Sequence, residues 1–254
     1  MIESFEKTKI AGEIAAGALD EVNNIIKPGI STIEIDKLCY QYINDHKAFS
    51  APLYYRGYPK SCCTSTNHIV CHGIPSDKVL MDGDIVNVDV TAIKDGWHGD
   101  TSRMFMVGEC SVKAKKLIKI TYDAMMKAIT VIKANTNIGN IGYTIQKIVE
   151  AEGFSVVRDF CGHGIGKKFH ENPNVLHYGE KNSGQELKAG MIFTVEPMIN
   201  YGKFETKTLK DGWTAVTKDK SLSAQFEHTV GVTKEGYEIF TLSKKGLNFP
   251  PNLK

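Results

Sequence analysis

The chain has 254 residues, of which 42% are hydrophobic, and a formal net charge of +2. That length can bury a sizeable core, and so small a charge does not by itself indicate nucleic-acid binding. No apolar signal core opens the sequence, and no apolar run reaches the ~18 residues of a membrane span. We therefore expect a soluble cytoplasmic enzyme whose six cysteines are free thiols.

The first quarter of the chain predicts two helices. Residues 2–26 carry apolar side chains at helical spacing, and the Lys-Pro-Gly sequence at 27–29 ends that helix. The pattern Ser31-x-x-Glu34 is a capping box, which predicts a second helix to about residue 46. Further helices are expected at 111–134 and 140–152, and strands at 61–108, 154–157, 191–201, 212–218, 222–232 and 237–241.

An Asp-Gly pair at 95–96 is a preferred two-residue hairpin turn between alternating strands. A turn centred there places Asp89 opposite Ser102, with Asp100 as the diagonal neighbour of Asp89 on the same face. Two carboxylates that close repel each other unless a cation lies between them. Two merely exposed carboxylates on a sheet remain the alternative at this point.

A weak internal repeat favours the interpretation that Asp89 and Asp100 share a cation. Residues 80–89 align without a gap on residues 187–196. In both segments a glycine turn opens an apolar strand, and an acid follows six residues after the glycine. The repeat predicts two similar halves with Asp89 and Glu196 in related positions, although chance similarity between strand entries is also open.

Five acidic and imidazole side chains stand in tight local contexts. They are Asp89, Asp100, His163, Glu196 and Glu227. Four carboxylates and one imidazole form a hard, oxygen-rich ligand set, unlike the cysteine-rich set of a structural zinc site. Such a set suits two divalent metal ions bridged by carboxylate and hydroxide.

The motifs around these residues are similar to those of the methionine aminopeptidase family. They are Cys71-His72-Gly73-Ile74-Pro75, Asp89-Val90-Thr91, His98-Gly99-Asp100-Thr101, Cys161-Gly162-His163-Gly164-Ile165-Gly166, Phe169-His170-Glu171-x-Pro173, Thr194-Val195-Glu196-Pro197-Met198 and Gln225-Phe226-Glu227-His228-Thr229. The resemblance runs from about residue 3 to residue 243, and the motifs stand in the family's order.

The resemblance implies the family's fold, a pseudo-two-fold "pita-bread" α/β (α+β) domain with a curved antiparallel sheet and helices on its outer face. We accordingly expect residues 1–254 to form a single catalytic metallopeptidase domain made of two related halves. The short separation of Glu196 and Glu227 leaves no room for the helical insertion of the family's second type. With no Cys/His-rich N-terminal extension, the chain resembles the minimal bacterial form of type I.

The resemblance also implies roles for the five ligands. Asp89 is similar to the family's terminal chelating carboxylate, and Asp100 and Glu227 match its two bridging carboxylates. His163 and Glu196 match the ligands that complete the other metal site. The implied cofactors are two divalent metal ions, and this ligand set accepts cobalt, manganese, iron or zinc.

Other histidines receive different roles from the resemblance. His72 and His170 match non-ligand histidines that contact the substrate amide and the developing oxyanion. Glu196 is the candidate for moving a proton from water to the leaving amine while bound to metal. His177 and His228 are expected to be structural or to support the ligands.

A methionine side chain needs a dry, polarizable, aromatic slot. The residues that match the family's slot are Tyr55, Tyr58, Cys63, Phe169 and Trp213. Pro52 departs from the pattern, because some relatives place a second pocket cysteine there. A nucleophilic Cys63 beside His72 is disfavoured, since a metal-bound hydroxide already supplies the nucleophile.

The resulting hypothesis is a monomeric enzyme that removes the initiator methionine from nascent polypeptide N-termini when the second residue is small. The basic segment 202–220 would approach the ribosome, as the resemblance implies, without sequence-specific nucleic-acid recognition and without a membrane. Three alternatives stay open: an X-prolyl peptidase of the same fold, a catalytically inactive binding protein, and a structural or nucleic-acid-binding role for lysines. The last alternative draws on the cluster Lys113, Lys115, Lys116 and Lys119.

Overall fold

The structure is a computed structural model that describes residues 2–253. Its α-helices are α1 (Ile2–Ile25), α2 (Thr32–Asp45), α3 (Val112–Ile129) and α4 (Gly139–Ala151), with 3-10 turns η1 (Tyr55–Gly57) and η2 (Pro251–Leu253). All four helices were predicted from the sequence. The capping box before α2 is present, because the Ser31 N–H donates to the Glu34 carboxylate at 2.8 Å.

Fifteen short strands lie within the described residues. They are β1 (Phe49–Ser50), β2 (Cys63–Thr66), β3 (Ile69–Cys71), β4 (Ile85–Lys94), β5 (Trp97–Met106), β6 (Ser155–Val156), β7 (Gly162–Gly164), β8 (Glu171–Val175), β9 (Ile192–Val195), β10 (Met198–Asn200), β11 (Thr206–Thr208), β12 (Ala215–Thr217), β13 (Ser223–Gln225), β14 (Glu227–Val232) and β15 (Tyr237–Ile239). Every strand pair within residues 2–253 is antiparallel.

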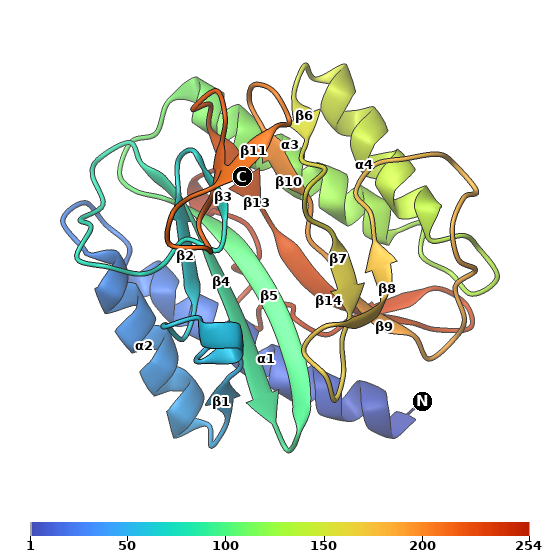
Figure 1. Cartoon of the computed structure of the whole chain (residues 1–254). Coiled ribbons are helices and arrows are strands. Elements are labelled where there is room, and N and C mark those ends of the chain that lie inside the picture. The colour runs from blue at the N-terminus through green and yellow to red at the C-terminus, as the bar shows by residue number, and fades with distance from the viewer. Residues whose placement is uncertain (1, 254) are drawn as a thin grey trace.

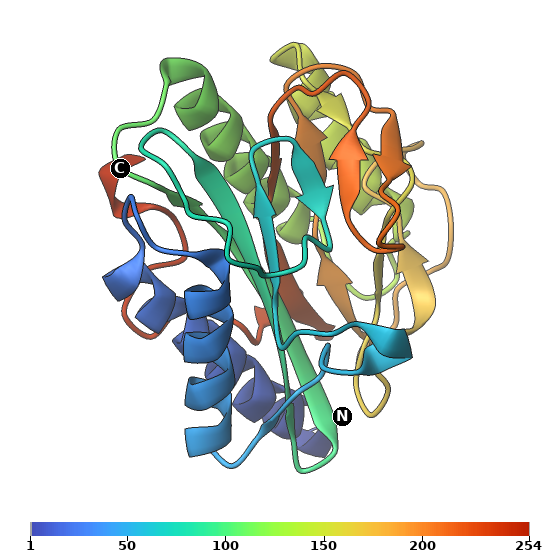
Figure 2. The ribbon, with the colours of Figure 1, turned by 60° about the vertical axis from the view of Figure 1, so that its left-hand side comes forward.

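The largest sheet has the strand order β1-β4-β5-β14-β9-β7-β8, with β2 added beside β4 and β15 beside β14. Two three-stranded sheets, β13-β10-β6 and β11-β12-β3, stand at one end of it. Figure 2 shows the small sheets leaning over the face of β4 and β5 that the helices leave open. The curved antiparallel sheet expected from the sequence is confirmed.

The helices cover the other face of the large sheet in two pairs (Figure 1). One core lies under α1 and α2 and includes Val86, Val88 and Val90 of β4. A second core lies under α3 and α4 and includes Phe193 and Val230. Because side chains alternate along a strand, burying these valines against the helices turns the intervening residues of β4 to the open face.

The predicted Asp-Gly hairpin forms with the expected register. Asp95 and Gly96 have φ of 49° and 77°, as a type I′ turn requires, and Asp89 pairs with Ser102. Asp100 pairs with Thr91, two residues further along the hairpin. Asp89 and Asp100 are therefore diagonal neighbours on one face, as the turn alone predicts.

Glycine at position 99 sets the distance between α1 and the sheet. A Cβ on Gly99 would lie 2.2 Å from the backbone nitrogen of Gly12 in α1, so only glycine fits there. The next residue, Asp100, points to the opposite face and is 4% exposed. The helix contact and the carboxylate position are thus fixed by adjacent residues of one strand.

The two segments of the internal repeat occupy equivalent places in the sheet. β4 and β9 flank the central pair β5–β14, one on each side. The repeat aligns Ile85 with Ile192, and these residues begin β4 and β9. The arrangement has the approximate two-fold relation that the repeat predicts.

Several strand boundaries predicted from the sequence are wrong. The expected strand 191–201 is broken into β9 and β10 at Glu196 and Pro197, where proline cannot donate to a ladder. The expected strand 222–232 is broken at Phe226, and its two parts join different sheets. The strand expected at 212–218 is only β12, and the short strands β1, β7, β8 and β11 were not predicted.

Candidate metal centre and substrate cavity

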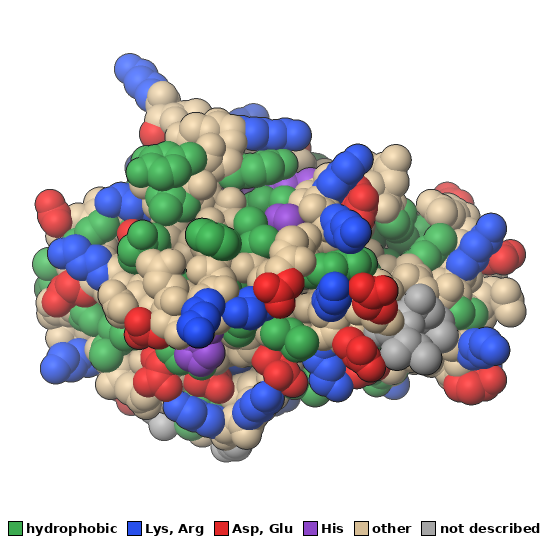
Figure 3. Space-filling view, turned by 90° about the horizontal axis from the view of Figure 1, so that it is seen from below, with side chains coloured by type: hydrophobic (Ala, Val, Ile, Leu, Met, Phe, Trp, Pro, Cys, Tyr) green, Lys and Arg blue, Asp and Glu red, His purple; other side chains and the backbone are tan. Residues whose placement is uncertain are grey.

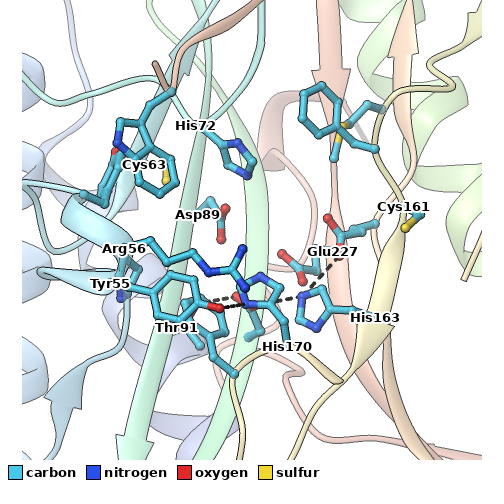
Figure 4. Close-up of a pocket in the computed structure, with 18 of the residues that line it drawn as sticks. Tyr55, Arg56, Cys63, His72, Asp89, Thr91, Cys161, His163, His170 and Glu227 are labelled. Atoms are coloured by element: carbon cyan, nitrogen blue, oxygen red, sulfur yellow. Dashed lines mark hydrogen bonds and ion pairs between the residues drawn. The ribbon is translucent and has the colours of Figure 1, made fainter. Parts of the chain in front are cut away.

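A cavity of about 410 Å³ opens on the face of the large sheet that carries no helices. All twelve side chains predicted for the site line it: His72, Asp89, Asp100, His163, His170, Glu196, Glu227, Tyr55, Tyr58, Cys63, Phe169 and Trp213. Figure 4 shows the ligand candidates on the strand side of the cavity and the aromatic side chains around them. The structure therefore brings the whole predicted set together.

Strand register places the candidate carboxylates side by side. Ser102 of β5 pairs with Asp89 on one side and with Glu227 of β14 on the other. Asp100 lies two residues from Ser102 on the same face. Three carboxylates from three neighbouring strands thus meet on one surface, although they are far apart in the sequence.

Glu196 reaches the same surface from the break between β9 and β10. Its backbone N–H donates to Nε2 of His177 at 3.1 Å, and the Thr194 hydroxyl donates to its Oε1 at 2.6 Å. Gln225 Nε2 contacts its other oxygen at 3.4 Å. These contacts hold Glu196 in the break between β9 and β10. Pro197 keeps this segment out of the strand ladder, because proline has no N–H to donate. His177 thereby supports a ligand candidate, as expected from the sequence.

Asp100 is held from both neighbouring strands. The Thr91 hydroxyl donates to its carboxylate at 2.7 Å. The Thr229 hydroxyl accepts from the Asp100 N–H at 3.0 Å and donates to the Asp100 carbonyl oxygen at 2.7 Å. Threonines on both adjacent strands therefore fix the backbone and one carboxylate oxygen of Asp100.

His163 faces the carboxylates with its ring nitrogen Nε2. Its Nδ1 lies 3.0 Å from the Gly164 carbonyl oxygen, which can only accept a hydrogen bond, so Nδ1 carries the proton. Nε2 then presents a lone pair, at 3.8 Å from Asp100 Oδ2 and 3.6 Å from Glu196 Oε1. A lone pair facing ionised carboxylate oxygens is repulsive unless a cation or a proton lies between them.

Burial makes the carboxylates hard to ionise without a cation. It raises the pKa of Asp89 to about 7 and that of Glu196 to about 8. The pKa values of Asp100 and Glu227 rise well above the usual range, first through burial and then through the neighbouring carboxylates. Burial also lowers the pKa of His163 to about 4, which leaves its imidazole neutral.

These residues fit a divalent metal centre. One ligand atom each from Asp100, His163 and Glu227 lies within 4.8 Å of the others. Glu227 is 2% exposed, and its Oε1 has no hydrogen-bond partner within the described residues. The unpartnered buried carboxylate oxygen, the raised carboxylate pKa values and the inward-facing imidazole lone pair all favour bound positive charge.

The two non-ligand histidines stand at different edges of the cavity. His72 has a left-handed backbone, with φ of 56°, and its ring contacts Phe160 and Trp213 edge-on. His170 lies beside His163, and its Nδ1 is 3.0 Å from the Tyr55 hydroxyl. Burial lowers the pKa of both rings, that of His170 to about 3. Both are therefore neutral hydrogen-bonding groups at neutral pH.

Aromatic side chains form two walls of the cavity. The rings of Tyr58 and Trp213 meet edge-on with centroids 5.1 Å apart. The ring centroids of Tyr55 and Phe169 are 4.9 Å apart on the other wall. Cys63 is buried beside Tyr58. Apolar aromatic walls with a sulfur atom suit an unbranched thioether side chain.

Sequence reasoning missed several lining residues. They are Arg56, Thr91, Asp159, Phe160, Cys161 and Met198. Thr91 and Cys161 lie inside quoted motifs but were given no role, whereas Arg56 and Asp159 belong to no motif. His98 was also missed, and its ring stacks on Phe169 with centroids 5.7 Å apart. The signal that could have identified Thr91 is the hairpin register, which places it opposite Asp100.

Cys63 is not set up as a nucleophile. Burial and the charge of Asp89 raise the pKa of its thiol well above the usual range. Reactive cysteines need a lowered pKa. All six cysteines are free thiols, as predicted from the composition.

Basic and acidic side chains are interspersed on the face seen from below (Figure 3), so neither sign of charge dominates that face. In the predicted lysine cluster, Lys115, Lys116 and Lys119 form ion pairs with Glu109, Glu152 and Asp123. This helix face is therefore largely neutralised. Among residues 2–253, no helix is long and apolar enough to cross a membrane.

Comparisons with known proteins agree with this geometry. The model of metallopeptidase family M24 matches residues 6–234. A methionine aminopeptidase of Rickettsia prowazekii is 56% identical over 250 residues, which cover 98% of this chain and 96% of the relative. The methionine aminopeptidase of Escherichia coli strain K12 is 56% identical over 244 residues, covering 95% of this chain and 92% of the relative.

Solved structures share the fold. The crystal structure of the Rickettsia prowazekii methionine aminopeptidase matches with a TM-score of 0.94 and covers 95% of this chain and 98% of that one. A prolidase from Pyrococcus furiosus, 22% identical, matches with a TM-score of 0.77 over 96% of this chain but 65% of its own. The pita-bread fold expected from the motifs is confirmed, and the chain belongs to metallopeptidase family M24.

Proposed function

We propose that this chain is a metal-dependent aminopeptidase that removes the initiator methionine from newly made proteins. The observation that carries the proposal is the joint placement of the five ligand candidates and an aromatic, sulfur-lined slot in one cavity. The high identity to methionine aminopeptidases over nearly the whole chain supports the same activity. The substrates are accordingly polypeptide N-termini that begin with methionine.

We propose that the centre would hold two divalent ions. Asp89 would be a terminal ligand of one ion, Asp100 and Glu227 would serve both ions, and His163 and Glu196 would complete the ligands of the second ion. Bound divalent ions would act as Lewis acids and lower the pKa of a water held in the centre. Cobalt, manganese, iron and zinc are all compatible with four carboxylates and one imidazole.

The chain's own residues supply the remaining chemistry. Glu196, which lies among the ligand candidates, is the group we assign to take a proton from water and give it to the leaving amine. His72 and His170 are neutral and lie at the edges of the centre. We assign them to hold the scissile amide and to stabilise the oxyanion by hydrogen bonding.

Specificity for methionine is assigned to the two aromatic walls. Tyr55 and Phe169 form one wall, Tyr58 and Trp213 the other, with Cys63 between the sheet and the slot. Pro52 lines the cavity where some relatives carry a second cysteine, and its ring keeps that edge apolar. A slot closed on both sides leaves room only for a small second residue beside the metal ligands.

The X-prolyl alternative receives less support. The Pyrococcus furiosus prolidase is 22% identical, so it shares the fold alone, and the chain spans 65% of its length. A catalytically inactive binding protein is disfavoured because all five ligand candidates converge on one cavity. The lysine-based alternative is disfavoured by the ion pairs of α3.

We further propose that the described chain acts as one catalytic domain with two related halves, because β4 and β9 flank the central strand pair equivalently. We also propose that the protein is a monomer and acts in the cytoplasm, where new chains are made. Strands β11 and β12 form a hairpin within 202–220 that carries the exposed Lys207, and the loop of this hairpin carries Trp213 of the cavity. That hairpin is the candidate contact to ribosomal phosphates, which salt would screen.

Peptide hydrolysis after reconstitution with each metal tests the main proposal. Met-Ala, Met-Leu and Ala-Pro peptides distinguish the candidates. We expect Met-Ala to be cut much faster than Met-Leu, and Ala-Pro to be left intact. Preferential cleavage of Ala-Pro would favour the X-prolyl activity, and full activity of chelator-treated protein would reject the metal mechanism.

A further inference from the structure

Arg56 is placed at the cavity by a braced turn. Tyr54 and Arg56 both have left-handed backbones, with φ of 66° and 48°. Non-glycine residues seldom adopt this conformation unless the surroundings impose it. Here the Tyr54 N–H donates to the Tyr58 carbonyl at 2.8 Å, and the Gly57 N–H to the Tyr54 carbonyl at 3.2 Å. The turn is thus fixed, with Arg56 at its tip.

The base of this turn is anchored in the protein core. The Tyr58 side chain is 2% exposed, and its hydroxyl donates to the carbonyl oxygens of Cys62 and Gly73 at 3.1 and 3.0 Å. Tyr55, next to Arg56, contacts His170 through its hydroxyl. The position of Arg56 relative to the cavity is therefore set by buried contacts rather than by the surface alone.

The Arg56 guanidinium is available to a ligand. It lies 5.3 Å from the Tyr55 ring, and no ion pair or hydrogen bond of its side chain occurs within residues 2–253. Figure 4 shows the side chain extending from η1 towards His170. Among the described residues that line the cavity, Arg56 is the only lysine or arginine. An unpaired cation at the mouth of an acidic centre will attract an anionic group that the centre itself would repel.

The path of a bound peptide passes this cation. Its first residue would fill the aromatic slot, so the rest of the chain must leave through the mouth. A shallower hollow adjoins the cavity at His163 and His170 and continues past Lys168, Asn172 and Asn174. The hollow also carries charges of both signs, Lys168 and Glu171, and the charged cavity residue Asp159 accepts a hydrogen bond from the Thr206 hydroxyl at 2.5 Å. A chain that leaves past His170 would pass close to the exposed Arg56 guanidinium, which extends towards that ring.

We propose that Arg56 makes this enzyme sensitive to the charge of the third or fourth substrate residue, favouring acidic and disfavouring basic side chains. The inference rests on the proposed aminopeptidase function. It adds a specificity contact beyond the methionine slot. Because the guanidinium is exposed, the contact is modest and salt-dependent.

Competition between peptides in one reaction tests the inference. Met-Ala-Glu-Ser and Met-Ala-Lys-Ser amides compete in one mixture, and Met-Ala-Ser-Glu and Met-Ala-Ser-Lys amides in another. The product ratio gives the ratio of kcat/KM directly, so a general loss of activity cancels. For the wild type we expect an acidic-over-basic preference of about two- to fivefold at one position, the range of exposed charge pairs.

Substitutions then assign the preference. Arg56→Gln should bring the ratio close to one, and Arg56→Glu should invert it. Lys60→Gln is the matched control, because it removes a nearby positive charge that does not line the cavity, and it should keep the wild-type ratio. High salt should reduce the wild-type preference without any substitution, which tests the charge effect even if a variant fails to fold.

The outcomes separate the inference from the proposed function. The role of Arg56 would be overturned if all methionine peptides were cleaved rapidly with no charge preference. It would also be overturned if both Arg56 variants kept the wild-type preference. Either result would leave the aminopeptidase activity intact. No cleavage of any methionine peptide by the metal-loaded protein would remove the proposed function, and this inference with it.

Discussion

The ligand centre and the aromatic slot of this cavity are built in different ways. The centre stands on paired strands: Asp89, Asp100 and Glu227 are placed by the register of β4, β5 and β14. The slot is assembled from turns, with Tyr55 in η1 and Trp213 in the loop between β11 and β12. Strand ladders hold groups to tenths of an ångström, whereas loops vary more easily. The chemistry is thus fixed by the sheet and the selectivity by the loops.

Removing a ligand from the sheet should have the largest effect. Asp100→Ala or Glu227→Ala removes a carboxylate assigned to both metal positions. We expect nearly complete loss of activity together with metal, a greater loss than for any non-ligand histidine. Metal content and peptide hydrolysis of the purified variants measure this. Glu235→Gln, on the exposed surface, is the matched control, and an Asp100 variant that keeps both metal and activity would contradict the assignment.

The histidines should separate metal binding from chemistry. His163→Ala should lose metal affinity, because its Nε2 faces Asp100 and Glu196. His72→Ala and His170→Ala should keep the metal and lower the rate by about 10²–10³-fold if either histidine stabilises the oxyanion. Metal analysis beside kcat distinguishes the two classes. A His170 variant purified without metal would show that this ring serves the centre and not the substrate.

Changing the slot should alter selectivity while leaving the centre in place. Phe169→Ala or Trp213→Ala opens an aromatic wall, and we expect discrimination between methionine and leucine as first residue to fall by about tenfold, the scale of one side-chain group in an apolar pocket. Metal content should stay unchanged, because neither ring supplies a ligand atom to the centre. Equal loss of metal and selectivity would mean that the two regions are not separable.

Stability should show how the carboxylates depend on bound cations. Their pKa values are higher in the folded protein than in the unfolded chain, so the folded metal-free protein binds more protons. The free energy of unfolding that these carboxyl groups contribute is therefore fully present below about pH 4, their pKa in the unfolded chain. It is lost as the pH rises through 7 to 8. We expect a divalent ion to raise the Tm by several degrees near pH 8 and by little near pH 5.

Thermal unfolding with and without metal at both pH values measures this effect. In Glu227→Gln the difference between the two pH values should shrink, because one titrating carboxylate is gone. A metal-induced rise in Tm that is the same at pH 5 and pH 8 would show that proton release from these carboxylates does not accompany binding.

Elements with local signals could be predicted from the sequence. Helical spacing and the capping box predicted α1 and α2, and the Asp-Gly turn fixed the register that pairs Asp89 with Ser102. A two-residue turn allows only one register between the strands that it joins. The pairing of Asp89 with Ser102 can therefore be predicted from the local sequence. Family motifs supplied the other ligand candidates and the slot residues, all of which line the cavity.

Features that depend on contacts between distant segments could not be predicted from the sequence. β8 is a polar edge strand with a proline, and β7 is largely glycine, so neither carries an apolar alternation. Glu196 lies in a break between sheets because Pro197 cannot join the ladder. Arg56 reaches the cavity only because buried Tyr58 anchors its turn. Such placements come from packing and hydrogen bonds between distant segments, which no local pattern in the sequence records.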